Sequence, residues 1–214
     1  TLFHEFGHAL HSMLSDVHYP MISGTSVARD FVELPSQIME HWATEPEVMK
    51  VYARHHETGA VIPDDLIKKI LAVQTFNQGF ATTEYLSASI LDLDWHSLET
   101  PDEQPANEFE TEAMNSLGLV EEITPRYRST YFSHIFSGGY SAGYYSYIWA
   151  EVLDADGFEA FLENGLFDPA TARAFRENVL ERGGSEDPMV LYRNFRGRDP
   201  EVEPLLRNRG LAAA

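Results

Sequence analysis

The sequence predicts a mainly α-helical protein, and two observations support this. Apolar residues recur every three to four positions in several segments, beginning with residues 2–15, which places them on one face of a helix. Glycine and proline, which interrupt helices, separate the segments. With 43% hydrophobic and 12% aromatic residues, the 214-residue chain has a globular composition and is long enough to bury a core. We expect one compact helical unit.

The first predicted elements are a helix over residues 2–15, a loop over 19–26 and a second helix over 30–42. The loop segment contains proline, glycine, serine and β-branched residues, a mixture typical of irregular structure. Asp30 has the position of an N-cap residue, and Glu33, three residues later, matches the second member of a capping box. The second helix is therefore predicted to begin at Asp30.

The rest of the chain is predicted as a series of helices. Residues 45–57 form the next one, because Pro46 suits a first turn, and a long helix runs from 63 to 98. The acidic, proline-containing segment 99–107 is the best loop candidate. Further helices are expected, in chain order, at residues 128–136, 140–153, 158–164, 169–182 and 187–195.

Composition and charge exclude several classes of partner. The net charge of −19 arises from 34 acidic and 15 basic residues, and such a charge repels nucleic acid and anionic lipid. No run of about 18 apolar residues is present, so no membrane-spanning helix is expected. The chain has no cysteine, so nitrogen and oxygen atoms must hold any bound metal. It begins at Thr1 within a helical pattern, and we expect a fragment of a longer protein.

The first predicted helix carries the motif H-E-x-x-H at residues 4–8. Positions four apart on a helix differ by about 40° in direction, so His4 and His8 project from one face towards a single ion. Glu5 is turned by about 100° from His4, which lets its carboxylate lean over the open side of the metal. Zinc with three protein ligands keeps a position for water and lowers its pKa to near 7. We predict one zinc ion on His4 and His8, with Glu5 as general base.

A third metal ligand must come from elsewhere in the chain. The candidates lie on the second predicted helix and are Asp30, Glu33, Glu40 and His41. Helical spacing puts Glu33 and Glu40 on one face and leaves them nearly tied. His11 shares the face of His4 but lies about 10 Å along the axis from it, too far for one tetrahedral site. We expect His11 to pack against a neighbour or to lie behind the ligands.

A second cluster of polar aromatic residues follows a glycine pair. Tyr140, Tyr144 and Tyr147 fall at positions i, i+4 and i+7, after the segment 137–139 (Ser-Gly-Gly) and shortly after His134. A stripe of this kind is most often core packing. An enzyme in which zinc-bound water attacks a carbonyl group, however, needs donors that face the resulting oxyanion, and a neutral phenol or imidazole can serve.

Four blocks of sequence resemble the thimet-oligopeptidase family of zinc peptidases, and within it the bacterial peptidyl-dipeptidases. They are TLFHEFGHALH at 1–11, RDFVELPSQIMEHWA at 29–43, PRYRSTYFSHIFSGGYSAGYYSYIWAEV at 125–152 and RGGSEDPMVLYRNFRGRDPEVEPLL at 182–206. The resemblance covers essentially the whole chain. It implies that residues 1–214 are the C-terminal part of a helical zincin catalytic domain lining a channel, with the N-terminal portion of the family absent.

The resemblance also implies roles for individual residues. In the family the glutamate of the block FVE-x-PSQ is the third zinc ligand. The corresponding residue here is Glu33, so the resemblance favours Glu33 over Glu40 as the third ligand. Tyr147 is expected to contact the oxyanion, and His134 the substrate backbone with a share in catalysis. Tyr140 and Tyr144 are expected to contact substrate.

Two arginines, Arg126 and Arg128, flank Tyr127 ahead of this cluster. A peptidyl-dipeptidase must bind the free C-terminal carboxylate of its substrate, and an arginine can do so with two parallel hydrogen bonds. Surface charge is the commoner explanation for such residues.

The resemblance therefore implies zinc-dependent hydrolysis of short peptides, with release of C-terminal dipeptides. The alternatives are cleavage of internal bonds in short peptides, or a zinc-binding fragment that is inactive without its N-terminal half. Expected partners are short peptides and that N-terminal half, with neither nucleic acid nor membrane. The expected location is the bacterial cytoplasm.

Overall fold

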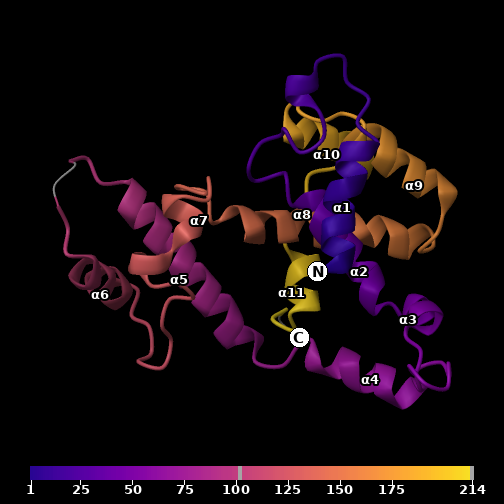
Figure 1. The fold of residues 1–214 in the computed structure, drawn as a ribbon, viewed down its shortest axis with the longest axis horizontal. Helices are drawn as coiled ribbons and strands as arrows, with labels where there is room; N and C mark the ends of the chain where they lie inside the picture. Colours follow the sequence, from indigo (N-terminus) through magenta and orange to yellow (C-terminus); the bar gives the residue numbers. More distant parts are fainter. Residues whose placement is uncertain (101–102, 213–214) are drawn as a thin grey trace. The chain divides into compact units, whose positions relative to one another are not determined.

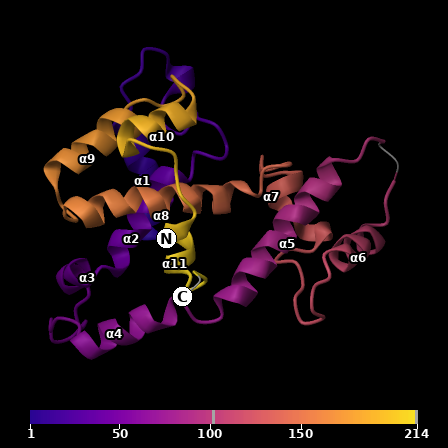
Figure 2. The ribbon, with the colours of Figure 1, turned by 180° about the vertical axis from the view of Figure 1, so that it is seen from behind.

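The structure, a computed structural model, describes residues 1–100 and 103–212 and is built of helices (Figures 1 and 2). Within these residues, β-type pairing is confined to an isolated antiparallel bridge between Arg54 and Val61. The predicted mainly α fold is therefore confirmed. No helix in the described part of the chain is long and apolar enough to cross a membrane.

In chain order, the α-helices of the described residues are α1 (Leu2–Met13), α2 (Leu34–Thr44), α3 (Pro46–Tyr52), α4 (Asp64–Val73), α5 (Gln78–His96), α6 (Ala106–Ser116), α7 (Ser133–Phe136), α8 (Ser146–Asn164), α9 (Pro169–Phe175), α10 (Pro188–Arg196) and α11 (Glu203–Asn208). Short 3₁₀ turns form at Pro20–Ile22 and Ser129–Tyr131, and a π-helical turn at Arg176–Leu180 continues α9. Proline lies in the first turn of α2, α3, α9, α10 and α11, where its missing N–H leaves no helical hydrogen bond unmade.

The chain divides into two compact units. Unit 1 comprises Thr1–Phe76 and Ile148–Ala214, and unit 2 comprises Asn77–Tyr147. Each unit has its own buried apolar cluster. The expectation of one compact helical unit is therefore wrong, because the segment from α5 to α7 buries its apolar residues mainly among themselves.

The core of unit 1 forms where α1, α2 and the C-terminal helices meet. Leu34 and Ile38 of α2 are fully buried together with Leu153 of α8 and Tyr192 of α10. Figures 1 and 2 both show α8 crossing α1 at this core. Truncating one such buried aliphatic side chain to alanine costs roughly 2–5 kcal/mol, so the packing of this cluster holds α1 and α2 in a defined relation.

The two helices approach each other closely at Gly7 of α1. A Cβ atom added to Gly7 would lie 2.2 Å from the carbonyl oxygen of Pro35 and 2.5 Å from the Cα atom of Ser36. Both distances are far shorter than van der Waals contact, so only glycine fits here without displacing α2. Gly7 therefore lets the helix that carries the H-E-x-x-H motif lie directly against the start of α2.

Unit 2 is organised around α5, with α6 and α7 beside it (Figure 1). Ala88 of α5 packs with Phe132, Ile135 and Tyr144 in a buried cluster. The rings of Phe132 and Tyr144 meet edge to face with their centroids 4.8 Å apart, a favoured aromatic geometry. This cluster joins α5 to the segment between α7 and α8.

The helix predicted over residues 63–98 is wrong as a single element, because it breaks into α4 and α5. Asn77, which immediately precedes α5, has a φ of 56°. This left-handed conformation ends an α-helix, and asparagine adopts it more readily than most residues do. The apolar pattern continues across the break, which is why periodicity alone does not reveal it.

The helices predicted over 140–153 and 158–164 form one helix, α8, that begins only at Ser146. Gly157 does not interrupt it. A Cβ added there would lie 3.4 Å from Cδ1 of Ile38 and 3.5 Å from Cε1 of Phe195, so the glycine serves close packing. Residues 140–145 form turns instead of helix.

Several other predicted boundaries also differ from the structure. Residues 29–33 form turns and α2 begins at Leu34 with Glu33 in the N-cap position, so the predicted N-cap at Asp30 is wrong. Three predicted helices are shorter in the structure: 45–57 contains α3, 128–136 contains α7, and 169–182 contains α9, each with neighbouring turns. The helix predicted over 187–195 corresponds to α10. Helices α6 and α11 were not predicted. The predicted loop 99–107 lies partly outside the described residues, and α6 already begins within it.

We expect Gly7→Ala to destabilise unit 1, because the added methyl group overlaps the Pro35 carbonyl. Overpacking of this kind costs about 1–3 kcal/mol, whereas Gly→Ala at an open helical position is favourable by up to about 1 kcal/mol. Gly79→Ala in α5 is the matched control, since no atom lies within 4 Å of the added Cβ. Thermal unfolding measures the difference. Equal melting temperatures for the two variants would contradict the close contact between α1 and α2.

Candidate functional site

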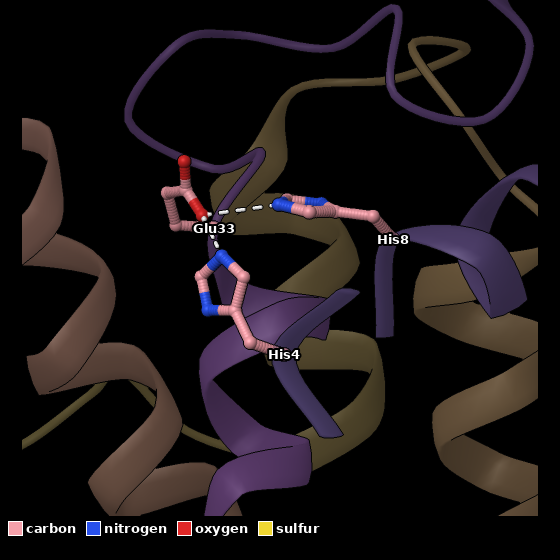
Figure 3. Close-up of side chains that lie close together, drawn as sticks. All are labelled: His4, His8 and Glu33. Carbon is pink, nitrogen blue, oxygen red and sulfur yellow. Dashed lines mark ion pairs between the residues drawn. The ribbon is translucent and has the colours of Figure 1, made fainter. Parts of the chain in front are cut away.

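Three side chains from two adjacent helices of unit 1 converge on one point (Figure 3). Nε2 of His4 lies 3.4 Å from Oε2 of Glu33, and Nε2 of His8 lies 3.3 Å from the same oxygen. Ligand atoms around a tetrahedral zinc with bonds of about 2.0–2.1 Å lie roughly 3.3–3.4 Å apart. The donor set of two imidazoles and one carboxylate thus has the chemistry and the spacing that a zinc ion requires.

The helix geometry explains the convergence. His4 and His8 lie one turn apart on α1, and their ring centroids are 5.0 Å apart. Glu33 is buried at the N-cap position of α2, where the contact at Gly7 brings it against both rings. The hydroxyl of Ser36 donates to Oε2 of Glu33 at 2.9 Å and lies 2.8 Å from its backbone oxygen. Ser36, which sequence reasoning did not single out, therefore helps to orient the carboxylate.

The structure separates the two glutamates that helical spacing left tied. Glu33 meets Nε2 of both histidines, whereas Oε1 of Glu40 lies 2.7 Å from Nδ1 of His4. A carboxylate on the outer nitrogen of a metal-binding histidine fixes the orientation and tautomer of the ring. Glu33 completes the convergent group, and Glu40 supports it from behind His4.

Glu33 has the largest effect on the pKa of His8. Its hydrogen bond with His8 is the largest influence and raises the pKa of that histidine. Burial of the ring acts in the opposite direction, while the charges of Glu33 and Glu5 add to the rise. Glu5 itself is exposed on α1, next to His4 in the sequence. A basic group at this position can accept a proton from a molecule bound at the metal.

The remaining ligand candidates have other partners. Nε2 of His41 lies 2.6 Å from Oδ1 of Asp154, and its ring stacks on Phe158 with centroids 4.5 Å apart. Burial raises the pKa of Asp154 to about 6, and the hydrogen bond with His41 opposes this rise. Among the described residues, neither Asp30 nor His41 joins the convergent group.

His11 is fully buried, and neither ring nitrogen has a hydrogen-bond partner among the described residues. Burial, and secondarily the charge of His8, lower the pKa of His11 to about 4. The burial agrees with the prediction that His11 packs against a neighbour or lies behind the ligands, and His11 is not part of the convergent group. The ring is therefore neutral at physiological pH.

The tyrosines and His134 of the second predicted cluster all belong to unit 2. The rings of Tyr140 and Tyr147 stack with centroids 5.1 Å apart, and Tyr144 lies 5.5 Å from Tyr147 and 5.7 Å from His134. Tyr147 alone lies on α8, because Tyr140 and Tyr144 precede it in turns. The predicted arrangement on one helical face is therefore wrong, although the residues do come together.

Burial differs among these residues. Tyr144 is 3% exposed and its burial raises the pKa of the phenol well above the ordinary value, so it is neutral. Tyr140, Tyr147 and His134 are partly exposed. Nδ1 of His134 is buried and has no hydrogen-bond partner among the described residues. The partly exposed members are thus the accessible ones.

The two arginines ahead of the cluster have different surroundings. Arg128 forms an ion pair with the buried Glu110, which also accepts hydrogen bonds from the backbone and hydroxyl of Ser129. Arg128 therefore has a structural partner, which argues against a role in binding a substrate carboxylate. Arg126 lies over the ring of Tyr127, with its guanidinium carbon 5.7 Å from the ring centroid.

A helix with the motif H-E-x-x-H, completed by a glutamate from a following helix, is the metal site of the zincin class of metallopeptidases. The chain belongs to Peptidase family M3, whose sequence pattern matches residues 1–211. The predicted resemblance to the thimet-oligopeptidase family is thereby confirmed.

Individual relatives match over nearly the whole chain. Dipeptidyl carboxypeptidase of Escherichia coli is 48% identical over 213 residues, and oligopeptidase A of the same organism is 44% identical over 214. A thimet-like oligopeptidase of Dictyostelium discoideum is 34% identical over 218 residues. These matches cover 99% of this chain but only 31–32% of each relative, so the chain spans about a third of their length.

We expect Glu33→Ala to abolish stoichiometric zinc binding, because it removes the oxygen shared by both histidines. Glu40→Ala should retain the metal with an affinity about 10–100-fold weaker, the usual cost of losing a residue that orients a ligand. Metal content after dialysis and competition with a chelator measure the two effects. The reverse ranking of the variants would show that Glu40 is the ligand.

The buried His11 should make the protein acid-sensitive. Its pKa is about 4 in the folded state and about 6.5 in an unfolded chain. Between these values the unfolded state binds the extra proton, so stability is lost as the pH falls from 6.5 towards 4, by up to about 3 kcal/mol. His11→Phe keeps an aromatic ring and removes the titrating group. Denaturant unfolding at pH 7 and pH 4.5 should show a smaller loss for the variant, and equal losses would contradict the assignment.

Proposed function

We propose that the protein is a zinc-dependent peptidase that hydrolyses short peptides and releases C-terminal dipeptides. The observation that carries this proposal is the convergence of His4, His8 and Glu33 beside the exposed Glu5. Membership of Peptidase family M3 supports peptide hydrolysis as the reaction. Because the chain spans about a third of its relatives, we assign the activity to the protein with all of its natural chain.

In the proposed mechanism His4, His8 and Glu33 hold one zinc ion. When bound, zinc supplies a Lewis acid that polarises the peptide carbonyl and makes water acidic enough to lose a proton near pH 7. Glu5 accepts the proton of the attacking water and later delivers it to the leaving amine. Glu40 binds Nδ1 of His4, which would keep the ring oriented for zinc to be held through Nε2.

The residues of unit 2 are proposed to act on the peptide itself. Tyr147 donates a hydrogen bond to the oxyanion that develops on the attacked carbonyl. His134, whose ring is partly exposed, binds the substrate backbone and contributes to catalysis. Tyr140 contacts substrate through its partly exposed ring. The burial of Tyr144 makes it the weakest of the proposed contacts, with a part in supporting Tyr147 as its best-supported role.

Release of dipeptides is preferred over internal cleavage because the relatives named dipeptidyl carboxypeptidase are 46–48% identical, against 40–44% for those named oligopeptidase A. A digest of a ten-residue peptide, followed by mass spectrometry, distinguishes the two. Stepwise loss of two C-terminal residues supports the proposal, and one internal cut supports the alternative. No hydrolysis by a zinc-loaded protein would favour a zinc-binding role without catalysis. The cytoplasmic location stays a prediction.

We expect Glu5→Gln to retain zinc and to lose most of its turnover. The substitution keeps the helix and the three ligands but removes the base, and general-base catalysis contributes ~10²–10⁴ in rate. Zinc content and steady-state hydrolysis of a short fluorogenic peptide measure the two quantities. Glu47→Gln, on the exposed first turn of α3, is a control for the loss of one negative charge. Turnover within tenfold of the wild-type rate would mean that another group takes the proton.

A further inference from the structure

The segment that carries the proposed substrate contacts is held in an unfavourable conformation. We call residues 140–147, which run from Tyr140 through the first turn of α8, the tyrosine loop. Within it Ala142 has a φ of 51°. This left-handed conformation is uncommon for residues other than glycine and persists only where surrounding contacts enforce it. Contacts within unit 2 must therefore hold the loop in this conformation.

The strongest contacts come from Asp92 of α5. Its carboxylate is fully buried and accepts two backbone hydrogen bonds from the loop. Oδ1 accepts from the N–H of Ala142 at 2.9 Å, and Oδ2 accepts from the N–H of Tyr144 at 2.8 Å. Hydrogen bonds to an ionised carboxylate are about twice as strong as neutral ones. Asp92 therefore fixes two peptide groups of the loop, one of them at the strained residue.

Two further residues of α5 complete the attachment. Nδ1 of His96, one turn after Asp92, lies 2.8 Å from Oδ1 of that carboxylate. The hydroxyl of Tyr85 donates to the carbonyl oxygen of Tyr144, and the two rings stack with centroids 5.3 Å apart. A buried carboxylate is costly unless its oxygens have donors, and here the donors are the backbone N–H groups of Ala142 and Tyr144. Nδ1 of His96 also lies 2.9 Å from the backbone oxygen of Asp92, its hydrogen-bond partner. The loop and α5 thus form one hydrogen-bonded assembly.

We propose that Asp92 is a positioning residue that sets the placement of Tyr140 and Tyr147 for catalysis. This inference rests on the proposed function, in which Tyr147 is the oxyanion donor. The rings of Tyr140 and Tyr147 stack on each other, so a shift of the loop backbone moves both. A misplacement of about 1 Å in a reacting group can lower the rate about 10²-fold. Asp92 binds the backbone N–H groups of Ala142 and Tyr144, so it acts through the backbone of the loop.

The test uses the zinc-loaded protein with all of its natural chain and a short fluorogenic peptide with a free C-terminus. Asp92→Asn keeps the size of the side chain but replaces one acceptor by a donor. We expect a loss of about 10–100-fold in kcat/KM at unchanged zinc content. In a Tyr147→Phe background the same substitution should cost less than about threefold, since the group it positions is already missing. Asp94→Asn, two residues away on α5, is the matched control and should leave kcat/KM unchanged.

A merely structural role for Asp92 gives a different pattern. In that case Asp92→Asn would lower the melting temperature and leave kcat/KM unchanged, or it would reduce kcat/KM equally in the wild-type and Tyr147→Phe backgrounds. Either result overturns the proposal. If Asp92→Asn does not fold, His96→Gln tests the same assembly from a partly exposed position. We expect about a threefold loss in kcat/KM that disappears in the Tyr147→Phe background, and equal losses overturn the proposal here too. Failure of the proposed function is distinct, because the zinc-loaded wild-type protein would then not hydrolyse the peptide, or Glu5→Gln would keep the wild-type turnover.

Discussion

The contact between α1 and α2 at Gly7 is the constraint on which the metal centre depends. Because no side chain separates the two helices at this point, the backbone of Pro35 and Ser36 lies directly against α1. Glu33, just before α2, then reaches Nε2 of both histidines. A larger residue at position 7 would move α2 outward, and the carboxylate oxygen would no longer match the spacing of a tetrahedral ion. The close packing of α1 against α2 is thus what gives the three ligand atoms the spacing that a metal ion requires.

Buried carboxylates organise the rest of the molecule in a similar way. Asp92 binds the tyrosine loop in unit 2, and Glu110 binds Arg128 and Ser129 there. In unit 1 the buried Asp156 accepts from the hydroxyl of Tyr192 at 2.5 Å and pairs with Arg198. A buried charge is tolerated only when donors surround it. A chain with a net charge of −19 therefore uses some of its acidic residues as internal attachment points.

The residues assigned to the proposed reaction belong to both units. The metal ligands and the general base belong to unit 1, whereas the proposed contacts to the oxyanion and the substrate belong to unit 2. Each group is assembled locally, by helix packing in one case and by the attachment of a loop to α5 in the other. The chain spans about a third of the length of its relatives.

The sequence by itself determined what short-range spacing encodes. The helical repeat places His4 and His8 one turn apart, and with Glu5 they identify the chemistry; the apolar periodicity identifies the mainly α class. Tertiary contacts decided the rest. Glu33 and Glu40 are nearly equivalent by spacing, but in the structure Glu33 reaches Nε2 of both His4 and His8, whereas Glu40 reaches Nδ1 of His4. Gly157 has the sequence appearance of a break, yet it lies within α8 because Ile38 and Phe195 pack against it. Asp92 is an ordinary acidic residue in the sequence, and only the fold brings residues 50 positions away to its carboxylate.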